Sequence, residues 1–299
     1  MIKSYMAIAA LLLTPLAQAE QPVEQRAPAD PQGEVEVSSV SGLVSIDGWD
    51  RNEVQVTGTL GDDVERLDFV SDPKRNHTLI KVVMKTSSNR SHRDDGDAEL
   101  SIRVPAASRL NANTVSADLS VSSVRGEQRL QTVSGEISSE IAAEDVEAKT
   151  VSGNVVLRGD NKPAVVTVTT VSGDAQVVRA AGEIVANSVS GSLNLGVDQI
   201  TRARARTTSG DLELKGTLAR DARVDVETIS GEVNLDFKGT VNAEFEIESF
   251  SGEIDNCFGQ KAQPTNKHGP GSELNFKQGE GSARVRVQSL SGEIRLCGK

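Results

Sequence analysis

Acidic side chains recur at one fixed place in a short repeated motif. The motif reads T-[VI]-S-G-x-[VIL], with Ala117 in place of the glycine in one copy, and the residue after this position is acidic in seven copies. If the copies stack, these carboxylates form one outward column, in which neighbouring charges repel unless water, splaying or cations intervene. The column predicts either an acidic ridge that binds Ca²⁺ or a basic partner, or a solvated face, and we favour the solvated face. Its members are Asp118, Glu136, Asp174, Asp211, Glu232, Glu253 and Glu293.

Hydroxyl side chains occupy two other positions of the motif. Ser stands one residue before the glycine, and Thr or Ser stands three residues before it. Stacked hydroxyls can present a flat, repetitive face to a polysaccharide, although we favour hydrogen bonding at a chain corner. Repetition in every copy, and the lack of a G-x-S-x-G sequence, argue against a unique serine nucleophile.

Histidine spacing does not indicate a metal site. His77, His92 and His268 are far apart in the sequence, and none belongs to an H-E-x-x-H motif. Residues 92–97 resemble a loop that can hold Ca²⁺, but they lack the EF-hand pattern, so we expect a charged loop. We therefore predict no cofactor, with Ca²⁺ binding as the alternative.

The two cysteines predict a disulfide. Cys257 and Cys297 are the only ones, and each lies five residues after its motif glycine, so they hold equivalent positions. Equivalent positions on adjacent parallel strands are about 4.8 Å apart, which a disulfide can span, whereas strands two apart are too distant. A bridge would make Gly252 and Gly292 neighbours, with 258–281 as a loop excursion; otherwise that segment is a degenerate repeat.

The elements that carry these residues follow from the repeat itself. The motif recurs ten times, and successive glycines from Gly135 to Gly252 are 18, 20, 18, 19, 21 and 21 residues apart. Apolar residues recur seven, five and two positions before the glycine and two and four after it. This alternation is typical of two short strands around a bend. We predict an all-β protein, a parallel β-solenoid of 18–21-residue repeats, with Val151 and Val171 pointing inward.

The sequence divides into four parts. Residues 1–19 have a charged start, an apolar run and an A-x-A site, which indicates a signal peptide. Residues 20–33 are predicted to be a flexible lead-in, and 34–110 an N-terminal β cap continuous with the solenoid. Residues 111–299 hold the repeats, among them Arg202, Arg204 and Arg206, which we expect to face outward and offset acids such as Asp198 and Asp211.

Composition excludes several partner classes. The chain of 299 residues carries a net charge of −11, which argues against nucleic acid and anionic membranes. Aromatic residues make up 3%, so sugar clefts and interfaces that depend on Trp and Tyr are disfavoured. No stretch is long and apolar enough to cross a membrane. We expect an exported protein, either periplasmic or at the cell surface.

The repeats resemble those of the bacterial putative-adhesin family of β-strand repeat proteins, a domain of unknown function. The resemblance rests on the T-V-S-G-[DE]-[IVL] copies and on the stretch from Val44 to Val56, and it covers roughly residues 34–299. It implies a β-solenoid-like fold in exported or envelope-associated proteins, and it transfers no catalytic residues.

These observations favour a non-catalytic, adhesin-like binding or scaffolding surface in the cell envelope. The partner would be an envelope component, a polysaccharide or a protein. The alternative is a polysaccharide-active β-helix enzyme, a lyase or a hydrolase, whose acids would converge in the irregular segments 86–98 and 258–281.

Overall fold

The regular secondary structure of the described residues consists of β-strands. The computed structural model describes residues 21–72, 74–86, 97–142, 144–265 and 270–298, and over these ranges it contains no helix, so none that could cross a membrane. The strands are β1 (Gln21–Pro28), β2 (Glu34–Ser39), β3 (Gly42–Trp49), β4 (Glu53–Leu60), β5 (Val64–Asp72), β6 (His77–Met84), β7 (Ala98–Pro105), β8 (Arg109–Thr114), β9 (Asp118–Ser122), β10 (Gln128–Gln131), β11 (Ile137–Ile141), β12 (Val146–Lys149), β13 (Val155–Gly159), β14 (Pro163–Thr170), β15 (Ala175–Ser188), β16 (Leu193–Ser209), β17 (Leu212–Ser230), β18 (Val233–Phe237), β19 (Ala243–Ser251), β20 (Ile254–Asn256), β21 (Gln263–Pro264), β22 (Ser272–Gln278), β23 (Ala283–Ser291) and β24 (Ile294–Gly298).

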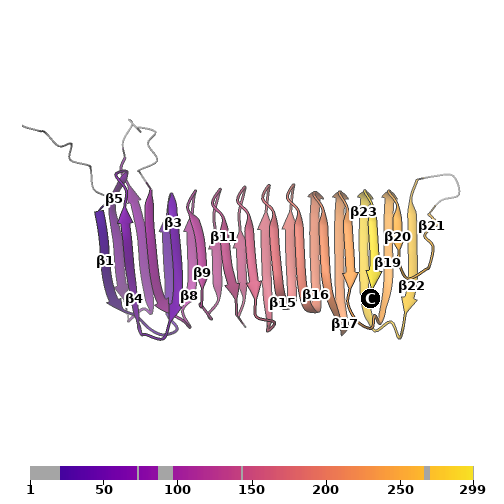
Figure 1. Cartoon of the computed structure of the whole chain (residues 1–299), viewed down its shortest axis with the longest axis horizontal. Coiled ribbons are helices and arrows are strands. Elements are labelled where there is room, and N and C mark those ends of the chain that lie inside the picture. The colour runs from indigo at the N-terminus through magenta and orange to yellow at the C-terminus, as the bar shows by residue number, and fades with distance from the viewer. Residues whose placement is uncertain (1–20, 73, 87–96, 143, 266–269, 299) are drawn as a thin grey trace, which may run out of the picture.

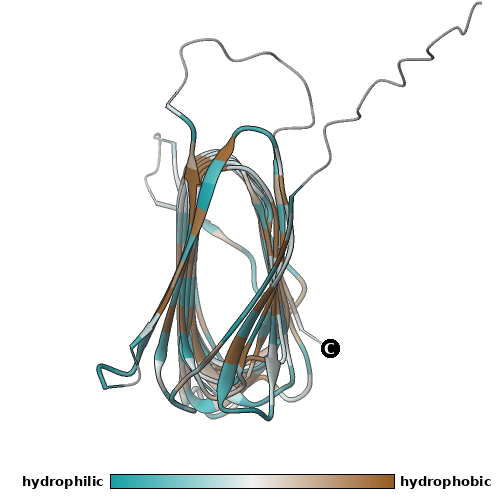
Figure 2. Cartoon of the chain, turned by 90° about the vertical axis from the view of Figure 1, so that its left-hand side faces the viewer, coloured by the Kyte–Doolittle hydropathy of each residue, from teal (hydrophilic) through white to brown (hydrophobic). Residues whose placement is uncertain are grey.

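The strands coil into a solenoid-like structure with two facing walls. Figure 1 shows the strands side by side along the long axis, and Figure 2, which looks along that axis, shows a flattened oval. Each turn of the coil, here called a rung, places one strand segment in each wall, and the long strands β15, β16 and β17 contribute segments to both walls. Parallel pairing joins the rungs: β12 pairs with β10 and β14 in one wall, and β13 pairs with β11 and β15 in the other. The predicted all-β, largely parallel architecture is confirmed.

Alternate side chains of both walls fill the interior. Leu130, Ile137 and Leu157 are fully buried, as are their neighbours above and below in the stack. Successive side chains of a strand point to opposite faces, so buried and mostly apolar residues alternate with residues that meet solvent. Each rung thereby extends one continuous hydrophobic core.

The motif forms the corner between the two walls. The Gly153 N–H donates a hydrogen bond to Oγ1 of Thr150 at 2.9 Å, and Gly173 and Gly191 repeat this contact with the hydroxyl three residues earlier. A Cβ added to Gly153 would overlap the carbonyl oxygen of Gly135 on the next rung. The glycine is therefore required by the close approach of stacked backbones.

The corner corrects the predicted orientation of one motif position. Val151 and Val171, expected in the core, are 46% and 40% exposed. The hydroxyl residue three before the glycine is the one that points inward, so the two residues that follow it both lie outside the corner. The inward alternation resumes only at the glycine.

The last rung along the chain is not the last in space. β23 pairs with β17 on one side and with β19 on the other, and β24 pairs in the same way with β18 and β20. The C-terminal rung thus lies between two rungs that precede it in sequence. In Figure 1 the yellow strand β23 lies between the orange strands β17 and β19.

The C-terminal end of the core is closed by an antiparallel strand and an aromatic cluster. β22 pairs antiparallel with β19, so the described part of 258–281 is an excursion that covers the end of the coil. Phe276 stacks on Phe245, with ring centroids 4.7 Å apart, and Phe258 packs against both. The predicted disulfide is confirmed: Cys257 and Cys297 are bonded, with Cα atoms 4.9 Å apart, and they join neighbouring rungs.

The N-terminal end is closed by antiparallel strands as well. β2 and β3 form a rung that lies between the β6–β7 rung and the β8–β9 rung. β4 pairs antiparallel with β7, and β5 with β6. Residues 21–28, which the sequence predicts as part of a flexible lead-in, instead form β1, which pairs antiparallel with β4 along its whole length. Pro22 and Pro28 stand in this strand, as is typical of an edge that must not pair further.

Candidate functional site

A straight column of exposed apolar side chains follows the corner of the solenoid. The position two residues before the motif glycine is apolar in nine of the ten copies, and Thr208 occupies the remaining one. We call this column the corner ridge; it comprises, in stacking order, Val40, Val115, Val133, Val151, Val171, Val189, Ile229, Leu290 and Phe250, all of them exposed. Ten rungs spaced by about 4.8 Å give the ridge a length of about 43 Å.

Backbone hydrogen bonds hold the corner ridge in register. The N–H of Ser152 donates to the carbonyl oxygen of Val133 at 2.9 Å, and Ser172 donates to Val151 at 2.8 Å. The same bond joins Ser209 to Val189 further along the stack. The ridge is therefore a feature of a rigid, paired backbone rather than of a free loop.

A serine column accompanies the ridge on one side. All ten residues that precede the motif glycine are serines, and the nine from Ser116 onward are exposed. The hydroxyl of Ser134 donates to the carbonyl oxygen of Val115 at 3.4 Å, and that of Ser152 donates to Val133 at 3.3 Å. These serines therefore reach the ridge backbone of the neighbouring rung.

The seven predicted acidic residues form the next column and are all exposed. Their shorter members bond to the stack: Asp118 Oδ1 accepts from the N–H of Glu136 at 2.8 Å, and Asp211 Oδ1 from that of Glu232 at 2.9 Å. Asp174 makes the same contact to Ser192. The insertion of the last rung places Glu293 between Glu232 and Glu253. Over the described residues, no acidic or histidine cluster has the arrangement of a metal site.

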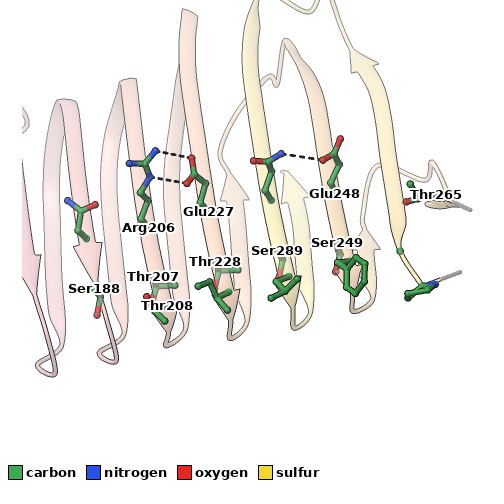
Figure 3. Close-up of a pocket in the computed structure, with 17 residues that line it drawn as sticks. Ser188, Arg206, Thr207, Thr208, Glu227, Thr228, Glu248, Ser249, Thr265 and Ser289 are labelled. Atoms are coloured by element: carbon green, nitrogen blue, oxygen red, sulfur yellow. Dashed lines mark hydrogen bonds and ion pairs between the residues drawn. The ribbon is translucent and has the colours of Figure 1, made fainter.

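A groove runs beside the corner ridge near the C-terminal end of the coil. It has a volume of about 780 Å³ and crosses five rungs, from Asn187 to Phe250. Its apolar edge is formed by Ile229, Leu290 and Phe250, which are 51%, 51% and 58% exposed and larger than the valines of the other rungs. Thr265, Pro270 and Gly271 close its far end. Figure 3 shows how the labelled side chains line this groove.

Paired polar side chains form the wall of the groove. Nε and Nη2 of Arg206 donate to the two carboxylate oxygens of Glu227, both at 3.0 Å, and Nε2 of Gln288 donates to Glu248 at 3.3 Å (Figure 3). The hydrogen bonds and charge of Glu227 raise the pKa of the Arg206 guanidinium. Arg202 pairs with Glu183, so Arg202 and Arg206 are offset by Glu183 and Glu227 rather than by the expected Asp198 and Asp211.

Three buried hydroxyls beneath the groove have no hydrogen-bond partner. Thr207, Ser249 and Ser289 occupy the position that bonds the motif glycine in earlier rungs, but their oxygens bond to nothing in the described structure. A buried polar group without a partner costs about 1–3 kcal/mol. The groove is thus the stretch of the ridge where the corner is least satisfied internally.

Other predicted sites are not assembled by the structure. His77 lies 3.3 Å from a carboxylate oxygen of Glu36, at the N-terminal end. His92, His268 and nearly all of the segment 86–98, including most of the predicted charged loop at 92–97, lie outside the described residues, as does the predicted signal peptide. The corner ridge and its groove were missed by the sequence analysis, and the exposed position could have been found only from the corner geometry.

Comparison with known proteins supports the fold. The model of the family described as Toastrack DUF4097 matches residues 12–203 and 69–297. No curated protein matches significantly. A solved structure of a putative lipid binding protein from Parabacteroides distasonis is similar at 13% identity and a TM-score of 0.52, covering 92% of this chain and 97% of that one.

Two further solved structures are more distant in shape. A putative adhesin from Bacteroides fragilis is 11% identical with a TM-score of 0.39, over 93% of this chain and 98% of its own. A putative cell adhesion protein from Clostridium sporogenes is 12% identical with a TM-score of 0.25, over 93% and 100%.

Proposed function

This chain belongs to the Toastrack DUF4097 family, and we propose that it is a non-catalytic protein whose corner ridge binds an elongated partner in the bacterial cell envelope. The observation that carries the proposal is the exposure of nine apolar side chains in one line. Water-exposed apolar surface is costly, and contiguous patches of it commonly mark interaction sites.

The scaffold suits a repetitive contact. Nine of the ten rungs present an apolar residue, every rung presents a serine, and most rungs present an acid or amide, all at a fixed spacing. A partner that repeats along its length can make the same weak contact several times, and linked contacts add to a far higher overall affinity. The rigid backbone avoids the entropy loss that ordering a flexible surface would cost.

The acidic column supplies selectivity in this proposal. Asp118, Glu136, Asp174, Asp211, Glu232, Glu253 and Glu293 are exposed along one flank of the ridge. Their charge repels anionic surfaces and attracts basic groups. These carboxylates could alternatively act through bound Ca²⁺. Repeating the binding measurement with and without a chelator distinguishes the two, because only a Ca²⁺-dependent contact is lost when the chelator is added.

An exported location is part of the proposal. The disulfide between Cys257 and Cys297 suits an oxidising compartment. The signal-like start of the sequence supports the same placement.

The test is retention of the purified chain on envelope fractions and polysaccharides, with analysis of soluble products. We expect retention without products, and loss of retention when Val133, Val151 and Val171 are replaced by Ser. The matched control is Val165→Ser, because Val165 is another exposed valine that lies outside the ridge. New reducing ends or unsaturated sugars would instead support a polysaccharide-active enzyme. Retention that changes neither with this variant nor with replacement of Ile229, Leu290 and Phe250 would reject the ridge.

A further inference from the structure

We infer that the groove at Ile229, Leu290 and Phe250 binds the apolar face of a cationic amphipathic α-helix. The inference rests on the proposed function and names the partner class for one part of the ridge. It concerns only this groove, whose larger apolar side chains and flanking charge differ from those of the valine rungs.

The apolar edge offers more contact area than any other stretch of the ridge. Ile229, Leu290 and Phe250 are each at least half exposed and stand on three consecutive rungs. Leu290 reaches the middle of this edge only because the C-terminal rung is inserted between two others. The result is a compact row of large side chains beside a groove rather than a thin line of valines.

The spacing of the rungs matches a helix better than a strand. Rungs are about 4.8 Å apart, and successive turns of an α-helix rise about 5.4 Å. Same-face residues of an extended strand lie about 6.6–6.8 Å apart, so they lose register with the rungs after one step. A helix with apolar residues at i, i+3 or i+4, and i+7 keeps register over the three rungs, as in helix-in-groove recognition.

Charge selects a cationic helix. Glu227 and Glu248 line the groove, and its one lining cation among the described residues, Arg206, is already held by Glu227. On the other side of the corner ridge lie four acids of the acidic column that form no ion pair within the described structure. In stacking order they are Asp211, Glu232, Glu293 and Glu253. Two other cations, Arg204 and Arg286, lie two residues further from the corner than the groove residues Arg206 and Gln288. They alternate there with Asp225 and Glu246 on neighbouring strands.

A second copy of this chain fits the groove less well. An isologous contact would bring the acidic columns of two chains together, and like charges at an interface oppose association. A helix with lysine or arginine along both edges of its apolar face would instead meet acids on both sides of the corner ridge: Glu227 and Glu248 in the groove, and the acidic column opposite.

The probe is a 14-residue peptide of leucine and lysine whose leucines follow a helical period. Its control peptide has the same composition in strict alternation, which favours a strand. Fluorescence anisotropy on the purified full chain should show the helical peptide binding at least about tenfold more tightly. The affinity should fall as salt is raised, because exposed charges contribute.

Two matched triple variants place the site on the ridge. Ile229→Ser with Leu290→Ser and Phe250→Ser should weaken the helical peptide at least about tenfold. Val133→Ser with Val151→Ser and Val171→Ser removes three ridge residues outside the groove and should change the affinity by less than about twofold. Both sets alter exposed side chains, so melting temperatures verify that the variants remain folded.

Several outcomes would overturn the inference. Equal affinity for the two peptides would show that the groove does not prefer a helix. An unchanged affinity in the groove variant would show that the peptide is held only by non-specific attraction to the acids. Dimerisation of the chain that the groove variant abolishes would assign the groove to a second copy. If envelope retention depends on the valine triple and not on the groove triple, this inference fails and the proposed function stands. If it depends on neither, the proposed function fails.

Discussion

Oγ1 of Thr150 accepts a hydrogen bond from the backbone N–H of Gly153 at 2.9 Å. The contact closes a tight corner, in which Thr150 is buried and the two residues between the partners lie outside. The same bond recurs at Gly135, Gly173 and Gly191, and on each of these four rungs the motif valine lies on the surface. The rungs of Ile229, Leu290 and Phe250 keep the same inward hydroxyl position and the same exposed apolar position without this bond, so the corner ridge continues through them.

The corner geometry predicts a contrast between two apolar positions of one rung. Val151→Asp places a charge in water and should change the free energy of unfolding by less than about 1 kcal/mol. Leu157→Asp buries an unpaired charge in the core and should cost more than about 4 kcal/mol or prevent folding. Denaturant titration measures both. Comparable destabilisation by the two substitutions would refute the assigned orientation.

Gly153 is predicted not to tolerate a side chain, unlike the equivalent position of the N-terminal rung that holds Ala117. Gly153→Ala would force a Cβ against the backbone of Gly135, so we expect a loss of about 3 kcal/mol or more. Ser152→Ala, its neighbour on the outside of the corner, should cost less than about 1 kcal/mol. Thermal melting of the two variants gives the comparison, and a stable Gly153→Ala protein would show that the rungs do not approach closely.

Much of this fold could be predicted from the sequence because its determinants are periodic. The alternation around Leu157, the spacing of the glycines and the equivalent positions of Cys257 and Cys297 each point to stacked parallel strands. Val151 was misassigned because hydrophobicity does not reveal how many residues a corner holds outside. The inserted rung of Leu290 leaves no trace in the local pattern, since its strands pair equally well with either neighbour. β1 was missed because its prolines and charges belong to an edge.

The aspartates of the acidic column are predicted to have a structural role that the glutamates lack. Asp118→Ala removes the acceptor for the N–H of Glu136 and should cost about 1 kcal/mol, whereas Asp118→Asn keeps an acceptor and should cost less. Glu136→Gln leaves every backbone bond in place and should be neutral within about 0.5 kcal/mol. Denaturant titration measures the stability of each variant. Equal stability of the Ala and Asn variants would show that the hydrogen bond accepted by Asp118 does not stabilise the fold.

The disulfide is predicted to hold the C-terminal rungs together. Replacing Cys257 and Cys297 by Ser should lower the free energy of unfolding by about 2–4 kcal/mol, mainly by freeing the unfolded chain. Hydrogen exchange should show the largest loss of protection in β20 and β24, with little change in β12 and β13. Uniform loss across all rungs would mean that the bridge supports the whole coil rather than its end.

Photocrosslinking from single sites tests the central claim most directly. A photoreactive residue placed at Val151, on the corner ridge, is compared with one placed at Val165, an exposed valine outside it. In intact envelopes the account predicts that the Val151 site captures a partner, whether protein, glycan or lipid, and that the Val165 site does not. Equal capture from both sites, or capture from Val165 alone, would contradict the corner ridge as the binding surface.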